Sequence, residues 1–279
     1  MRILKPLEVD AEEVFNETIK NKSVENQIIL NSLKELVFYR YKTYENNKLE
    51  LGKINNPIVL DKNKKDTLIN CYSRDSKYYI GKLTAEIISK QDVHVQSNCP
   101  CCGLSSPDTI DHYLPKTEFP EYSILPINLI PSCGTCNNLK KSNWRDGINR
   151  QYLNFYFDSF IKQKFLYAYI TFDAINKNYP SVSFKLEKPN LISEKEFEIV
   201  KSHYEKLNLF KRCESHAVSE ISNVYTEISM GKEIDIKIHK NTLLRRVNVY
   251  KRNYGVNNWR TCLYEALANS DEFLSTCIS

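Results

Sequence analysis

The first ninety residues carry two stretches in which apolar side chains recur every three to four positions. One runs over residues 23–44, where Ser23 stands in the position of an N-cap, and the other over residues 78–90. This spacing places the apolar side chains on one face of a helix and predicts a helix in each stretch. Residues 46–65 between them are polar, contain Pro57 and end in DKNKK, which is typical of a connection. The N-terminal part of the chain is therefore expected to be mostly helical.

The pattern changes to alternation in the second half of the chain. FLYAYITFDAI (residues 165–175) and SVSFKLE (residues 181–187) alternate large apolar residues with smaller or polar ones, and NKNYP between them has turn residues. These stretches predict a β-hairpin. Ser193 and Glu196 then have the spacing of a capping box, so we expect a helix from there to about Phe210, followed by further helices.

Length and composition indicate a folded protein of more than one part. The chain has 279 residues, which exceeds the usual single domain. Its 42% hydrophobic and 26% charged residues, with seven glycines, argue against a disordered or low-complexity chain. The sequence shows no secretory signal and no apolar run long enough for a membrane span, so we expect a cytoplasmic protein. A net charge of +5 gives only a weak bias towards anionic partners.

Nine cysteines in a chain expected in a reducing compartment need an explanation other than disulfides. Cys99 with Cys102, and Cys133 with Cys136, form two C-x-x-C pairs separated by thirty residues. Two thiolates at this spacing can bind one cation from a tight turn, and a second such turn completes a four-sulfur shell. Buried or redox-active thiols are the alternative, but a single C-x-x-C would suffice for redox chemistry. The two C-x-x-C pairs therefore predict a structural zinc ion, and Cys101 is expected not to be a ligand.

Polar residues that could take part in catalysis lie between the two cysteine pairs and just after the second pair. Asp111 and His112 are adjacent, and Asn128 follows in a proline-rich loop. Asn137 comes directly after the second pair. Together with the cysteine frame, DH, the downstream NL and CxxCNxxK resemble the HNH, or ββα-metal, endonucleases with a zinc-bound scaffold. The resemblance covers about residues 98–144.

This resemblance implies a role for each matching residue. His112 corresponds to the general base, and Asn128 to the residue whose amide holds the hairpin that carries the base. Asp111 and Asn137 correspond to ligands of a catalytic Mg²⁺ or Mn²⁺ ion. The residue types suit these roles, because a neutral imidazole can take a proton from water near cellular pH and Mg²⁺ prefers hard oxygen ligands. Neighbours on a regular strand point to opposite faces, so Asp111 and His112 share a site only if the backbone is locally irregular.

A narrower resemblance concerns the same region. DHYLPK, the following FP and NLIPSCGTCNNLKKSNW are similar to the nuclease subunits of Septu-type antiphage defence systems, including those linked to retrons. That resemblance implies a role in antiviral defence and a separately encoded ATPase partner of the ABC type. The sequence itself contains no G-x-x-x-x-G-K-[ST] phosphate loop, so we do not expect this chain to sense a nucleotide.

A basic segment lies near the C-terminus. Residues 237–260 contain seven Lys or Arg residues and no acidic residue. A helix here would present arginines to a phosphate backbone, although a solvated helix face would have the same pattern. Lys116 and Lys141 are expected to be solvated charges. The residues that we expect to contact nucleic acid are Lys140, Arg245, Arg246 and Arg252.

These patterns together predict an α+β protein in which helical arms surround a zinc-bound ββα nuclease unit, with a β-hairpin after it. We expect a helical region over residues 1–95, the nuclease unit over residues 96–150, and the hairpin and further helices over residues 151–279. The predicted function is metal-dependent hydrolysis of phosphodiester bonds in nucleic acid, with DNA favoured over RNA. The alternative is a non-catalytic zinc module that binds nucleic acid or a partner protein and does not use the Asp-His-Asn set.

Overall fold

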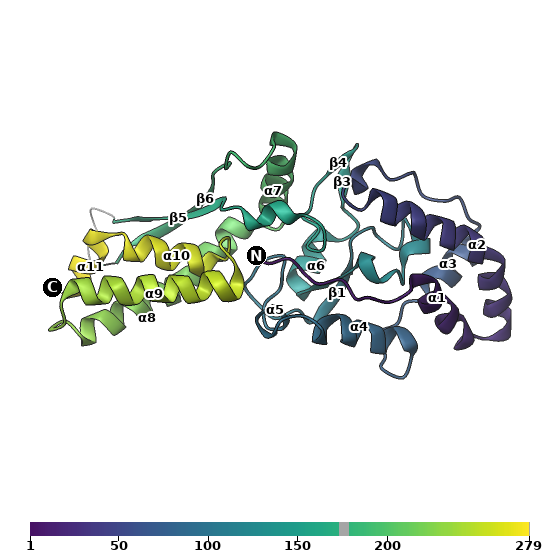
Figure 1. The fold of residues 1–279 in the computed structure, drawn as a ribbon, viewed down its shortest axis with the longest axis horizontal. Coiled ribbons are helices and arrows are strands. Elements are labelled where there is room, and N and C mark those ends of the chain that lie inside the picture. The colour runs from purple at the N-terminus through teal and green to yellow at the C-terminus, as the bar shows by residue number, and fades with distance from the viewer. Residues whose placement is uncertain (173–178, 279) are drawn as a thin grey trace. The chain divides into compact units, whose positions relative to one another are not determined.

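The computed structural model of the protein describes residues 1–172 and 179–278. Helices predominate, and the strands within those ranges form three two-stranded antiparallel sheets (Figure 1). The predicted α+β class is therefore confirmed. No helix in the described part of the chain is long and apolar enough to cross a membrane.

The chain divides into two compact units. The first unit consists of residues 3–101 and 105–159, and it contains every residue expected to take part in catalysis. The second unit consists of residues 1–2, 102–104 and 160–279.

Helices form the N-terminal part of the first unit. Ser23 accepts a hydrogen bond from the backbone N–H of Asn26 and so caps α2, as predicted. The helices α1, α3 and α5 lie outside the two predicted stretches, and α3 falls where a connection was expected. Asp61 caps α3 by accepting a hydrogen bond from the backbone N–H of Lys64, so DKNKK is the start of a helix and not a connection. The elements are α1 (Ala11–Lys20), α2 (Val24–Asn47), η1 (Leu51–Lys53), α3 (Lys62–Ile69), α4 (Tyr79–Ser89) and α5 (Val93–Gln96).

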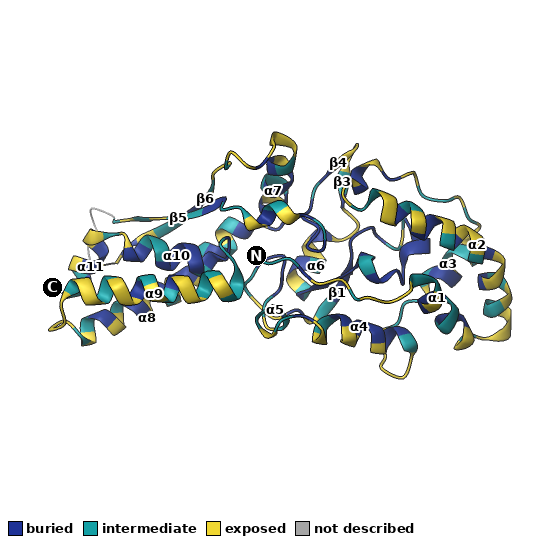
Figure 2. Ribbon diagram, in the orientation of Figure 1, coloured by how far each residue is buried: buried dark blue, intermediate teal, exposed yellow. Residues whose placement is uncertain are grey.

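The core of this unit combines aromatic rings with one buried ion pair. The inner face of α2 is buried (Figure 2), and the ring of Tyr44 meets that of Tyr122 edge-on at 5.2 Å. Arg40, also on α2, is buried and donates from its Nε to the carboxylate of Glu121 at 2.8 Å. Breaking a buried ion pair leaves an uncompensated charge, so this contact fixes α2 to the turn η2 (Pro120–Tyr122).

A β-hairpin followed by a helix forms the rest of the first unit. β1 (Thr109–His112) and β2 (Leu129–Ser132) pair in antiparallel register, with Asp111 opposite Ile130. The helix α6 (Gly134–Lys140) follows β2 after a single residue. The remaining elements here are η3 (Pro126–Asn128), β3 (Arg145–Asp146) and β4 (Asn149–Arg150).

The second unit packs a β-hairpin against helices. The predicted hairpin is confirmed over residues 166–171 and 181–186, whereas residues 173–175 of its first stretch and part of its turn, NKNYP, lie outside the described residues. The capping box of Ser193 and Glu196 is present. The helix it starts ends at Lys206 and not at Phe210, because Asn208 takes a left-handed conformation with φ of 50°. The elements are β5 (Leu166–Thr171), β6 (Ser181–Leu186), α7 (Glu194–Lys206), α8 (Leu209–Met230), α9 (Ile236–Tyr254), α10 (Trp259–Ala268) and α11 (Asp271–Ile278).

Candidate functional site

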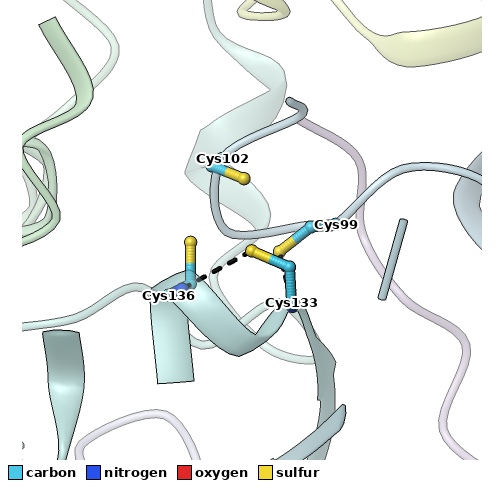
Figure 3. A group of neighbouring side chains, drawn as sticks. All are labelled: Cys99, Cys102, Cys133 and Cys136. Atoms are coloured by element: carbon cyan, nitrogen blue, oxygen red, sulfur yellow. Dashed lines mark hydrogen bonds between the residues drawn. The ribbon is translucent and has the colours of Figure 1, made fainter. Parts of the chain in front are cut away.

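The two C-x-x-C pairs come together in space. The sulfur atoms of Cys99, Cys102, Cys133 and Cys136 all lie within 4.8 Å of one another, and all four residues are buried (Figure 3). Cys133 is the N-cap of α6, and its sulfur accepts a hydrogen bond from the backbone N–H of Cys136 at 3.5 Å. The backbone N–H of Cys133 points to the sulfur of Cys99 at 3.3 Å. N–H groups directed at sulfur stabilise the thiolate form that metal ligation needs.

The geometry of this cluster suits a zinc ion. Zinc–sulfur bonds of about 2.3 Å place tetrahedral thiolates roughly 3.8 Å apart, so four sulfurs within 4.8 Å need only small shifts to bind one ion. Gly103 closes the first turn with φ of 67°, a conformation that favours glycine. Cys101 lies outside the cluster, with its sulfur 3.8 Å from the Oγ of Ser132. The four cysteines can therefore hold a structural zinc ion, as the sequence predicts.

Asp111 projects from β1 towards α6. Its carboxylate oxygens lie 3.0 and 3.2 Å from the ammonium of Lys140, and both side chains are buried. The same ammonium donates to the backbone oxygen of His112 at 2.8 Å. Burial raises the pKa of Asp111, and the charge of Lys140 opposes that rise. Lys140 is thus held on β1 and not free on the helix surface.

The side chain of His112 contacts the loop between β1 and β2. Its Nε2 lies 2.8 Å from the carbonyl oxygen of Ser123. Because a carbonyl oxygen only accepts hydrogen bonds, Nε2 carries the proton and Nδ1 keeps its lone pair. Burial, reinforced by nearby lysine charges, lowers the pKa of His112 to about 3. The imidazole is therefore neutral at cellular pH, with one nitrogen anchored and the other able to accept a proton.

Asn128 is fully buried and joins the two ends of the loop between β1 and β2. Its Oδ1 accepts from the backbone N–H of Leu114 at 2.8 Å and from the hydroxyl of Tyr44 at 3.3 Å. Its Nδ2 donates to the carbonyl oxygens of Leu114 and Tyr122, at 3.0 and 3.1 Å. The amide therefore fixes the loop that contains Ser123, and Ser123 in turn anchors the imidazole.

Asn137 lies on α6, one turn before Lys140. It is half-buried, and its Nδ2 donates to the Oγ1 of Thr109 at 3.2 Å. Within residues 1–172 and 179–278, no hydrogen bond joins Asn137 to Asp111 or His112. The structure therefore brings Asp111 and His112 into contact with Lys140 and places Asn137 beside the start of β1.

Sequence reasoning missed one residue that packs on His112. The ring of Tyr72 meets the imidazole edge-on at a centroid distance of 4.5 Å, and the ammonium of Lys116 lies 4.7 Å from the centre of the Tyr72 ring. The expectation that Lys116 is a solvated charge is wrong, because the residue is half-buried and burial lowers its pKa. Tyr72 lies in the loop after α3, far before His112 in the chain, and no local pattern links the two.

The basic segment forms the helix α9, and its arginines have different surroundings. The guanidinium of Arg246 pairs with Glu227 at 2.8 and 3.0 Å and donates to the hydroxyl of Tyr264 at 3.3 Å. Arg245 and Arg252 are exposed and form no ion pair among the described residues. Of the three arginines, Arg245 and Arg252 are therefore the two available to a phosphate backbone.

Replacing Arg245 and Arg252 by glutamine is expected to weaken binding to duplex DNA and to flatten its salt dependence. Each lost phosphate contact lowers the slope of log affinity against log salt concentration by about 0.9. Arg246→Gln is the matched control, because Glu227 already compensates its charge. Fluorescence anisotropy with a labelled duplex over a range of KCl concentrations measures the slope. An unchanged slope in the Arg245 and Arg252 variant would assign the segment to a solvated helix face.

Comparison with known proteins gives a distant relative and no family. No protein-family model matches the chain, and no solved structure matches it. The chain is similar to Protein ea31 of Escherichia phage lambda, with 26% identity over 189 residues. The matched region covers 63% of this chain and 62% of the length of that protein. This match does not establish a function for the chain.

Proposed function

We propose that this protein is an HNH endonuclease that hydrolyses phosphodiester bonds in nucleic acid, with DNA as the favoured substrate. One observation carries the proposal: His112 is a buried, neutral imidazole whose Nε2 is fixed on a backbone carbonyl, which leaves Nδ1 to accept a proton. The order of the surrounding elements supports it. The antiparallel strands β1 and β2 are followed by α6, with Cys133 and Cys136 at the junction of strand and helix.

In this mechanism His112 takes a proton from the water that attacks phosphorus. A bound phosphate adds negative charge beside the imidazole, which raises its pKa from about 3 towards the range of an effective base. Asp111 and Asn137 would hold a Mg²⁺ or Mn²⁺ ion, which when bound stabilises charge on the leaving oxygen. Asn128 fixes the loop that carries Ser123 and so keeps the imidazole oriented.

One contact favours a second candidate, a non-catalytic zinc module that binds nucleic acid or a protein. The carboxylate of Asp111 is already neutralised by Lys140, and a divalent cation next to an ammonium is electrostatically unfavourable. A catalytic ion therefore requires Lys140 to turn from Asp111 towards a phosphate oxygen of the substrate. In a non-catalytic module the ion pair would persist in the nucleic-acid complex.

We further propose that this nuclease is the effector of a bacterial antiphage defence system and is gated by an ABC-type ATPase. The Septu-type resemblance supports this role, and the chain has no phosphate-loop motif with which to sense a nucleotide. The helix α2 supplies a surface for a partner. Val24, Ile28 and Tyr39 on this helix are 73%, 67% and 64% exposed, and exposed apolar side chains gathered on one helix suit a protein interface.

The isolated chain is expected to be a weak nuclease that forms a stable complex with a separately encoded ATPase. Co-expression with the neighbouring genes, followed by size-exclusion chromatography, detects the complex. Ile28→Glu combined with Tyr39→Glu is expected to release the partner. Burying the two new carboxylates in the interface would cost more free energy than the remaining apolar contacts contribute. Val59→Glu is the matched control, since Val59 is 99% exposed and lies outside α2. Strong, unregulated activity of the chain without a copurifying partner would contradict the proposal.

Cleavage assays on the chain and on its complex separate the nuclease from the non-catalytic module. Plasmid, single-stranded DNA and RNA are each incubated with Mg²⁺, Mn²⁺ or EDTA. We expect DNA to be cut with either metal and to remain intact with EDTA. Binding without cleavage under every metal condition, with the ATPase present, would favour the non-catalytic module.

A further inference from the structure

The hydroxyl of Tyr72 lacks a partner beside His112. The Tyr72 ring packs edge-on against the imidazole at 4.5 Å, and its hydroxyl is buried with no hydrogen-bond partner among the described residues. Burial raises the pKa of this hydroxyl to about 12, so it remains a donor at cellular pH. A buried donor without an acceptor costs stability. Such a buried hydroxyl can donate a hydrogen bond to an acceptor atom of a bound ligand.

Lys116 has no acidic partner among the described residues. Its ammonium lies 4.7 Å from the centre of the Tyr72 ring, and the residue is half-buried. In the described part of the chain, no Asp or Glu forms an ion pair with Lys116, whereas Lys140 is paired with Asp111. A partly desolvated cation without an acidic partner favours binding of an anion.

We propose that Tyr72 and Lys116 bind a phosphate oxygen of the nucleic-acid strand held beside His112. The hydroxyl of Tyr72 donates a hydrogen bond to a non-bridging oxygen, and the ammonium of Lys116 neutralises its charge. The neutral imidazole is left to face the attacking water. This inference rests on the nuclease function proposed above, and it assigns substrate binding to two residues outside the predicted metal-ligand set.

Salt-dependent binding tests Lys116 without any cleavage. With a labelled DNA duplex, EDTA and a His112→Gln background, Lys116→Gln is expected to lower the slope of log affinity against log salt concentration by about 0.9. Lys77→Gln is the matched control. Lys77 also lies over a tyrosine ring, that of Tyr78 at 5.0 Å, but it is exposed and paired with Asp75 at 3.1 Å. An unchanged slope in Lys116→Gln overturns the phosphate contact.

The variant Tyr72→Phe separates a hydroxyl that binds a ligand from one that only packs. It keeps the ring on His112 and removes an unsatisfied polar group, so its melting temperature is expected to equal or exceed that of the wild type. Losing one hydrogen bond to a charged phosphate is expected to lower kcat/KM roughly ten- to a hundredfold. Tyr78→Phe is expected to change neither quantity, because Tyr78 lies at the exposed start of α4. Wild-type kcat/KM in Tyr72→Phe overturns the proposal, and so does a loss matched by a lower melting temperature.

Failure of this inference and failure of the nuclease function give different results. If the wild type binds the duplex but never cleaves it, the nuclease function fails, and the salt slope of Lys116→Gln still decides the phosphate contact. If the wild type cleaves DNA and Tyr72→Phe and Lys116→Gln behave like it, the nuclease function stands and the phosphate site is wrong.

Discussion

The variant His112→Gln is expected to lose roughly 10²- to 10⁴-fold in kcat while it keeps its affinity for nucleic acid. The amide nitrogen of glutamine stands at about the same distance from the backbone as the imidazole Nε2, so it can donate a hydrogen bond to the carbonyl of Ser123, but glutamine has no nitrogen that accepts a proton. The buried contact is therefore preserved and the base is removed. Steady-state kinetics on a labelled DNA substrate measure kcat, and anisotropy in EDTA measures affinity.

Controls for this prediction follow from the burial of His112. His112→Ala also removes the base, but it leaves a cavity and an unsatisfied carbonyl in the core, so it is expected to lose stability as well as activity. His216→Ala, at an exposed position on α8, is expected to behave as the wild type. Asp111→Ala and Asn137→Ala are expected to lose activity and to regain part of it in excess metal. An active His112→Gln protein would show that the base is misassigned.

Local patterns allowed much of the fold to be predicted, and the exceptions have a physical cause. The cap of α2 at Ser23 and the β5–β6 hairpin were predicted because their signals lie within a few neighbouring residues. The helix α3 was missed because its sequence, KNKKDTLI, has no apolar stripe. Its stability comes from the Asp61 cap and from burial of Thr67 and Leu68 against the rest of the unit, which local sequence does not reveal.

The site shows the same division between local and long-range information. The four cysteines were predictable, because ligand type and spacing are both written in the sequence. The surroundings of His112 were not, because they depend on how distant segments pack. Tyr72 reaches the imidazole from the loop after α3, and the anchor Ser123 lies in a loop held by Asn128. Arg246 likewise could not be separated from its neighbours on α9 until Glu227 was placed beside it.

Loss of zinc is expected to unfold the region around the cysteine cluster. Structural zinc sites contribute an apparent binding free energy of about 10–16 kcal/mol, which equals or exceeds the whole stability of a typical domain. Cys133 has two roles, because it is a member of the cluster and it caps α6 with its sulfur. Its loss therefore releases the helix that carries Asn137 and Lys140 as well as the metal. We expect Cys133→Ser to express poorly, to melt at a much lower temperature and to lose cleavage.

Metal analysis and thermal melts test this expectation directly. About one zinc ion per chain is expected to copurify with the wild type, and removing it with a chelator is expected to reproduce the low melting temperature of Cys133→Ser. Cys101→Ser is the matched control, because Cys101 is buried in the same turn but its sulfur contacts Ser132 and lies outside the cluster. It is expected to keep its zinc and to melt close to the wild type. A folded wild-type preparation without zinc would instead mean that the four buried thiols pack as ordinary core residues, and the position of α6 would then depend on the Asp111–Lys140 ion pair and on packing alone.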